Sequence, residues 1–164
     1  MFTPIGVTLN NSELMSDWHR TIRRYLVFVV TGNLFWEFLH LPLYTIWQEA
    51  TLFENAYAAI HCTAGDLIIA TCALMLSLLC FGNQDWPNTQ FSRVLTYTVL
   101  LGVSYTIYSE WVNIEIRQSW AYSEYMPVVP ILGTGLSPIA QWIVLPIAGM
   151  YWASRNPKQN LLSN

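Results

Sequence analysis

The feature that most constrains the fold is the amount of apolar sequence that must be kept away from water. Of the 164 residues, 54% are hydrophobic and only 10% are charged, whereas charged residues make up about a quarter of an average soluble domain. The apolar residues gather in runs of about 20 or more, the length that a helix needs to cross a bilayer. We therefore expect an all-α, polytopic membrane protein with a single domain over residues 1–164.

Four transmembrane helices packed as a bundle are expected. Their approximate ranges are 24–47, 56–81, 93–114 and 137–153. Residues 11–22 are amphipathic, with Ser12 as N-cap, and predict a short helix on the membrane surface. Prolines and glycines between Met126 and Ser137 predict a broken, re-entrant or interfacial segment, after which Ser137 caps the fourth helix. The polar tail after Ser154 is expected to be disordered.

The basic residues predict the orientation of the spans. Of the seven Lys and Arg residues, only Arg117 lies between the third and fourth spans; the others precede the first, separate the second from the third, or follow the fourth. Because Lys and Arg are enriched on the cytoplasmic side of membrane proteins, both termini are expected in the cytoplasm. The first and third helices then run outward, and the second runs inward.

The first span contains the strongest candidate for a functional site. Asn33, Glu37, His40 and Tyr44 follow one another at i, i+4, i+7 and i+11, so they lie on one stripe of the helix. An ionisable side chain at bilayer depth is costly and usually serves a function. The alternative is an ordinary membrane helix in which Glu37 and His40 bond only each other.

Two other spans bring ionisable groups to the same depth. The second contains His61 and Asp66, and Asp66 lies in a stripe of small residues that favours close helix packing. Counted by rise per residue, these groups and those of the first and third spans lie within roughly 15 Å of the outer surface. The expected catalytic residues are Glu37, His40, Asp66, Glu110 and Tyr105, and those expected to bind a cofactor or substrate beside them are Asn33, Ser137 and Gln141.

Metal binding is one chemistry that this set offers. Glu37 and His40, three residues apart, can present a carboxylate and an imidazole to one ion. His61, Asp66 and Glu110 would complete a set of nitrogen and oxygen ligands that suits zinc, iron or manganese. The second Glu-x-x-His of a di-metal bundle is missing from the sequence. Without a metal, the same groups are expected to act as general acid and base on a lipophilic substrate from the bilayer.

Short motifs between Trp36 and Trp142 carry a resemblance to a known family. They are Trp36-Glu37, Pro42-Leu43-Tyr44, Gly65-Asp66, Glu110-Trp111, Trp120-Ala121-Tyr122, Met126-Pro127 and Gly135-Leu136-Ser137-Pro138. With them the chain resembles a family of small bacterial integral membrane proteins with four helices. The resemblance implies a location in the bacterial inner membrane, and it brings no activity and no catalytic residues with it.

Three classes of function fit the sequence. The first is an intramembrane enzyme or metal-binding protein, the second is a small transporter or proton-coupled carrier, and the third is a structural subunit or assembly factor. The expected partners are the lipid bilayer, a lipophilic small molecule and further copies of the chain. No basic patch suggests nucleic acid. Cys62, Cys72 and Cys80 share one apolar run and predict no disulfide framework.

The distribution of basic residues gives a prediction of topology. A reporter fused after Asn164 is expected to be active as a cytoplasmic protein, and one inserted at Glu49 as a protein of the outer side. Fusions to alkaline phosphatase and to a fluorescent protein measure the two locations. A cytoplasmic signal from the insertion at Glu49 would contradict both the orientation and the common depth of the ionisable groups.

Overall fold

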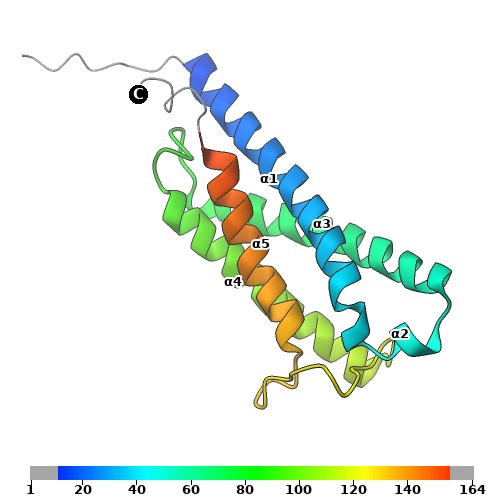
Figure 1. Ribbon diagram of the computed structural model, residues 1–164. Coiled ribbons are helices and arrows are strands. Elements are labelled where there is room, and N and C mark those ends of the chain that lie inside the picture. The colour runs from blue at the N-terminus through cyan, green and yellow to red at the C-terminus, as the bar shows by residue number, and fades with distance from the viewer. Residues whose placement is uncertain (1–10, 156–164) are drawn as a thin grey trace, which may run out of the picture.

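Four long helices lie side by side in the computed structural model, which describes residues 11–155 and their side chains from Asp17 onward (Figure 1). They are α1 (Asn11–His40), α3 (Leu52–Phe81), α4 (Phe91–Trp111) and α5 (Leu136–Ser154). Helices α1 and α4 each pack against both α3 and α5. Three short elements join them: the 3-10 helix η1 (Leu41–Leu43), α2 (Ile46–Glu49) and the π-helix η2 (Val112–Ile116). The described part of the chain contains no β-strand, which agrees with the predicted all-α class.

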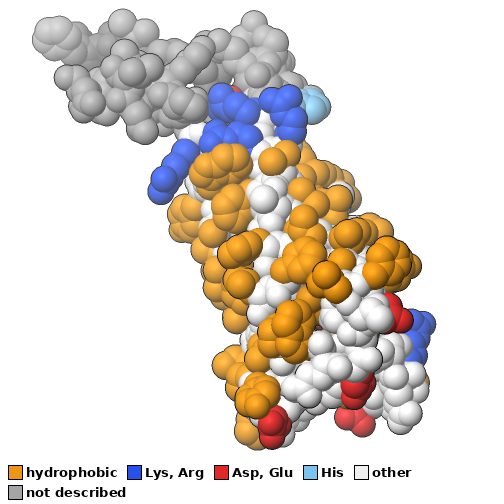
Figure 2. Space-filling model, turned by 45° about the vertical axis from the view of Figure 1, so that its right-hand side comes forward, with side chains coloured by type: hydrophobic (Ala, Val, Ile, Leu, Met, Phe, Trp, Pro, Cys, Tyr) orange, Lys and Arg blue, Asp and Glu red, His pale blue; other side chains and the backbone are white. Residues whose placement is uncertain are grey.

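Three of the long helices are long and apolar enough to cross a membrane. The candidate spans are Asp17–Leu43, Leu52–Phe81 and Leu136–Ser154. Helix α4, which is rich in Ser, Thr and Tyr, is not one of these three within the described residues. In Figure 2 a broad hydrophobic band covers the middle of the molecule, with Lys and Arg side chains gathered at one end and acidic ones toward the other. This distribution is typical of a membrane protein.

The first helix differs from its prediction at both ends. A surface helix over 11–22 and a separate span from 24 were expected, but α1 is continuous from Asn11 to His40. The reason is that no Gly or Pro interrupts its first twenty residues. It also ends before the predicted limit at 47, because Pro42 lacks the N–H that would continue the helix, and η1 replaces it. The predicted Ser12 cap and the tail beyond Arg155 lie outside the described side chains and residues.

Helix α3 begins four residues before the predicted start at 56. Thr51 is its N-cap, and its hydroxyl accepts a hydrogen bond from the Glu54 N–H (3.3 Å). The Glu54 carboxylate accepts one in return from the Thr51 N–H (2.8 Å). This reciprocal capping box fixes the first turn of α3 directly after the α2 segment.

The segment before α5 is irregular, as predicted, but its cap is a different residue. Gly135 is the N-cap of α5, and Ser137 lies inside the first turn. Val128 and Gly135 form an isolated bridge, and the turn between them includes Gly133 at φ +65°. Because Ser137 does not cap the helix, its hydroxyl is available to side chains of α1.

Most of the apolar core and the buried glutamate and histidine side chains occupy different halves of the molecule. The core contains Tyr25, Leu74, Val94 and Met150, which lie toward the end where Arg24 donates a hydrogen bond to the Arg155 carbonyl (2.9 Å). Glu37, His40, Glu110 and Gln141 are buried in the other half. The four helices are therefore held by apolar packing near one end and by hydrogen bonds near the other.

Close packing of α4 on α5 depends on Gly102, which gives a test of this arrangement. A Cβ at Gly102 would overlap the Trp142 ring, whereas a Cβ at Gly65 in α3 would meet no atom within 4 Å. Gly102→Ala should therefore lower the free energy of unfolding by about 1–3 kcal/mol, and Gly65→Ala should leave it unchanged or raise it by up to about 1 kcal/mol. Thermal unfolding in detergent measures both. Equal melting temperatures for the two variants would show that α4 and α5 are not packed this closely.

Candidate functional site

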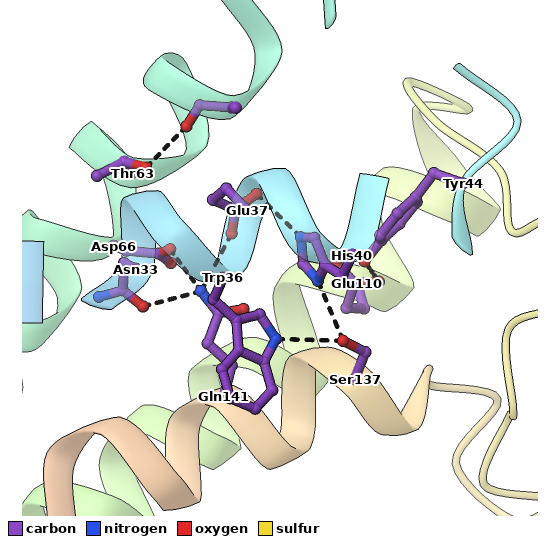
Figure 3. A network of polar contacts seen from close by, with 11 residues as sticks. Asn33, Trp36, Glu37, His40, Tyr44, Thr63, Asp66, Glu110, Ser137 and Gln141 are labelled. Carbon is purple, nitrogen blue, oxygen red and sulfur yellow. Dashed lines mark hydrogen bonds and ion pairs between the residues drawn. The ribbon is translucent and has the colours of Figure 1, made fainter. Parts of the chain in front are cut away.

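The stripe predicted on the first helix is buried and faces the other helices. Asn33, Glu37, His40 and Tyr44 are 3%, 7%, 7% and 9% exposed, while their neighbours Phe35 and Leu39 are exposed on the outer side of α1. The period of the helix explains this division, since residues spaced by three and four positions share a face. In Figure 3 Glu37 and His40 of α1 point toward side chains of α3 and α5, whereas Tyr44, which follows η1 and lies outside α1, points toward Glu110.

Gln141 of α5 is the centre of the first group of contacts (Figure 3). Its amide nitrogen lies 2.8 Å from Asn33 Oδ1, 3.1 Å from Glu37 Oε1 and 3.1 Å from Asp66 Oδ2. These oxygens come from α1 and α3, so one buried amide joins three helices. Gln141 itself is 2% exposed, and water does not compete for its hydrogen bonds.

The acceptor oxygens in this group outnumber the hydrogens of the amide. The Gln141 amide supplies two hydrogens for three oxygens. The carboxyl groups of Glu37 and Asp66 both lie within hydrogen-bond distance of this amide, and a proton on one of them removes the repulsion between two neighbouring carboxylates. Because Glu37 Oε2 is already 3.0 Å from His40 Nε2, we assign the negative charge to Glu37 and the proton to Asp66.

His40 lies between an acid and a hydroxyl. Its Nε2 is 3.0 Å from Glu37 Oε2, and its Nδ1 is 3.2 Å from Ser137 Oγ. Trp36 Nε1–H donates to the same Ser137 Oγ (3.2 Å). Since the indole can only donate, the Ser137 hydroxyl is free to donate to His40 Nδ1, and the ring then carries its proton on Nε2. The result is a directed chain from Trp36 through Ser137 and His40 to Glu37.

Glu110 forms a second group of contacts next to the first. Its Oε2 accepts hydrogen bonds from Tyr122 (2.5 Å) and Tyr44 (3.4 Å), and the Gly135 N–H donates to the Tyr122 oxygen (2.8 Å). Burial, followed by the hydrogen bond to the Glu110 carboxylate, raises the pKa of Tyr122 above its ordinary value. Tyr122 therefore remains a hydrogen-bond donor at neutral and mildly alkaline pH.

The two groups meet where the ring of His40 contacts the ring of Tyr44. The ring centroids are 5.3 Å apart in an edge-to-face arrangement. Ionisable side chains thus follow one another from Asp66 through Glu37 and His40, and then through Tyr44 to Glu110. This series crosses from α3 over α1 to α4, which no single stretch of sequence could reveal.

Glu110 is the member of this series that lines a pocket. The pocket has a volume of about 430 Å³. It is bounded by the end of α4, the π-helix η2 and the turn before α5, through Glu110, Trp111, Ile114, Glu115, Pro130, Ile131, Leu132 and Gly133. A small molecule in this pocket would touch the Glu110 carboxyl while the rest of the polar groups remained buried behind it.

Two predicted site residues lie elsewhere. His61 is exposed and stacks on Tyr57, with ring centroids 5.9 Å apart; it is five positions from Asp66, which is too far round the helix to share its face. Tyr105 is 47% exposed and packs edge-on against Tyr108. The buried positions of α4 instead follow four-residue steps, at Thr98, Gly102, Thr106 and Glu110.

The predicted metal site is not supported by the described residues. Among residues 11–155, no three His, Cys, Asp or Glu side chains are placed so that they could hold a metal ion. Glu37 and His40 bond each other directly, and His61, a proposed ligand, is exposed. The remaining chemistry is that of acids, bases and hydroxyl groups.

Several side chains of the site were not predicted. From the sequence, Tyr122 and Trp36 were noted only as parts of the motifs that carry the family resemblance. In the structure Tyr122 donates to Glu110, and Trp36 donates to Ser137. Tyr44 was placed on the correct stripe but not in the site. The stripe was the one available signal, because Tyr122 reaches Glu110 through irregular chain that has no periodicity.

No known protein family matches the chain, and neither a characterised protein nor a solved structure shows detectable similarity to it. The assignment of function therefore rests on the arrangement of these side chains.

The contacts of Asp66 predict how its substitution affects folding. Asp66→Asn keeps a donor for Glu37 and should fold with nearly wild-type stability. Asp66→Leu removes one hydrogen-bond partner of Gln141 and places an apolar side chain among buried polar groups, so it should lower the free energy of unfolding by about 1–3 kcal/mol. His61→Ala, on the same helix but outside the network, is the control and should have no effect. Equal melting temperatures in detergent for wild type and Asp66→Leu would argue against the network.

Proposed function

We propose that the chain is an integral membrane protein with four transmembrane helices, α1, α3, α4 and α5, and with both termini in the cytoplasm. The three apolar spans and the Arg-rich end support this topology. Helix α4 packs between α3 and α5, so its polar face is covered by its neighbours. In the bilayer these neighbours would satisfy the hydrogen-bonding groups that lipid cannot.

Within this topology we propose an intramembrane enzyme that performs acid–base chemistry on a lipophilic substrate. The observation that carries the proposal is the series of ionisable side chains from Asp66 to Glu110, which ends at a pocket. Hydrogen bonds join its members except between His40 and Tyr44, where the two rings are in contact. General acid–base catalysis needs a donor and an acceptor held in fixed positions. Glu110 would meet the substrate, and the groups behind it would supply or accept the proton.

A purely structural role explains these residues less well. Three carboxyl groups and a histidine are placed among apolar helices. Replacing buried charged side chains by well-packed hydrophobic ones often leaves the stability of a protein unchanged or raises it. Ionisable residues at membrane depth are also usually retained for function. Direct connection to a pocket is a feature that a helix-packing role does not need.

One observation favours a proton-coupled carrier as the second candidate. Next to Glu110 the chain departs from regular helix twice, in the π-helix η2 and in the segment before α5. Interrupted helices often line ion or substrate pathways in transporters, and π-helical turns are frequent at functional sites. The series of titratable groups would then transfer a proton without converting a substrate chemically.

Lipid profiling tests the enzyme proposal. Wild type, Glu110→Gln and Glu115→Gln are expressed at equal levels in a bacterial host, and membrane lipid extracts are compared by mass spectrometry. Wild type should change the amount of at least one lipid species by several-fold relative to the empty host, and Glu110→Gln should abolish the change. Glu115, exposed on the wall of the same pocket, is the matched control and should behave as wild type.

Two results would contradict the enzyme proposal. The first is identical lipid profiles for wild type and the empty host, which would remove the basis of the proposal. In that case, a proton flux into proteoliposomes with the wild type that is lost with Glu110→Gln would establish the carrier. A change that survives in Glu110→Gln would show that the buried series does not perform the chemistry.

A further inference from the structure

We propose that Ser137 is the nucleophile of this site and that the substrate is a carboxylic ester with a long acyl chain. The inference deepens the proposed enzymatic function and rests on it. From the sequence, Ser137 was expected to cap the fourth helix and to belong to a binding site. The geometry gives it a base and gives that base an orienting acid, which is the arrangement used by serine hydrolases on many unrelated folds.

The three groups lie in consecutive hydrogen-bond contact. Ser137 Oγ is 3.2 Å from His40 Nδ1, and His40 Nε2 is 3.0 Å from Glu37 Oε2. Glu37 and His40 are buried, whereas Ser137 is half-buried. The Ser137 hydroxyl is therefore the most exposed of the three groups, and its base and acid are buried behind it.

The neighbours of these groups favour the catalytic direction of each hydrogen bond. Trp36 Nε1–H occupies one lone pair of Ser137 Oγ (3.2 Å), so the hydroxyl hydrogen is free to point at His40 Nδ1. On the other side, the Gln141 amide donates to the Glu37 carboxylate. An acid fixed in this way orients the imidazole and stabilises it when it becomes positively charged.

The start of α5 leaves one backbone donor next to the nucleophile. Four amide positions at a helix start have no partner within the helix, here residues 135 to 138. The Gly135 N–H donates to Tyr122 and the Leu136 N–H to the Pro127 carbonyl, while Pro138 has no N–H. Within the described chain this leaves the Ser137 N–H, which is placed to stabilise the oxyanion of an acyl group attached to its own side chain.

The surroundings of Ser137 indicate a substrate from the bilayer. Leu136, the residue before Ser137, is 48% exposed on the surface of α5, and Trp36 of α1 contacts Ser137 through the hydrogen bond from its indole N–H. Under the proposed topology this surface contacts acyl chains. An ester whose acyl chain lay along it would bring its carbonyl carbon to Ser137.

The reaction is a two-step hydrolysis that consumes water. Ser137 Oγ attacks the carbonyl carbon and forms a C–O bond while its proton moves to His40 Nδ1. The bond to the leaving alcohol breaks, and the alcohol oxygen takes that proton. Water then attacks the acyl-Ser137 ester with His40 again as base. Release of the carboxylic acid returns the proton to Ser137 Oγ.

An alkyl fluorophosphonate tests the nucleophile directly, because it phosphonylates an activated serine with loss of fluoride. Full-length protein in lipid nanodiscs is incubated with the probe, and the label is located by intact mass and peptide mapping. We expect one label per chain, on Ser137. Ser137→Ala should abolish labelling, and Glu37→Gln should slow it by about 100-fold or more. Ser154→Ala, at the other end of α5, is the control and should label at the wild-type rate.

The outcomes separate this inference from the function on which it rests. An unlabelled wild type, or a label on another serine, would overturn the role of Ser137. If the wild type still changed the lipid profile and this change required Glu110, the proposed acid–base enzyme would remain supported without a nucleophilic role for Ser137. Ser137→Cys, which keeps the volume of the side chain, serves if Ser137→Ala misfolds. It should retain the wild-type melting temperature and lose both the label and hydrolysis of a long-chain fluorogenic ester.

Discussion

A carboxylate buried among apolar helices must be met by hydrogen-bond donors from its surroundings, and Glu37 is the group on which this structure depends. His40 on the same helix lies 3.0 Å from it, and Gln141 of α5 donates both to it and to Asp66 of α3. Burying a charge without such partners is far more costly than the net stability of a typical domain allows. The requirement therefore fixes the register of three helices at once, while the apolar core near Tyr25 tolerates repacking more easily.

Helix period explains what could be predicted from the sequence. The stripe from Asn33 to Tyr44 is buried, and the small residues around Asp66 face the neighbouring helices. Tyr105 lies within about 20° of Thr98 round the helix, but the buried positions of α4 advance by four residues and so turn by about 40° at each step. By Thr106 and Glu110 the buried face has turned away from Tyr105. The contacts of Tyr122 and the role of Gln141 as the centre of the site depend on chain segments that meet only in three dimensions. No local pattern specifies them.

Irregular chain at the polar end completes the site. Tyr44 and Tyr122 form an isolated bridge, and the Thr45 N–H donates to the Ala121 carbonyl (3.0 Å), so the segment after η2 is held against the end of α1. This attachment brings Tyr122 to Glu110 and leaves a pocket beside that carboxyl. Regular helices thus position the acids and the histidine, and irregular segments form the pocket and complete the contacts of Glu110.

Nitrogen-15 NMR of the histidine rings in the full-length protein tests the central claim, that His40 lies between Glu37 and Ser137 as an oriented base. At neutral pH the account predicts a neutral His40 ring with its proton on Nε2 and a bare Nδ1. Glu37→Gln should shift both nitrogens, and Glu49→Gln should shift neither. A proton on Nδ1, or His40 nitrogen signals that do not respond to Glu37→Gln, would contradict it.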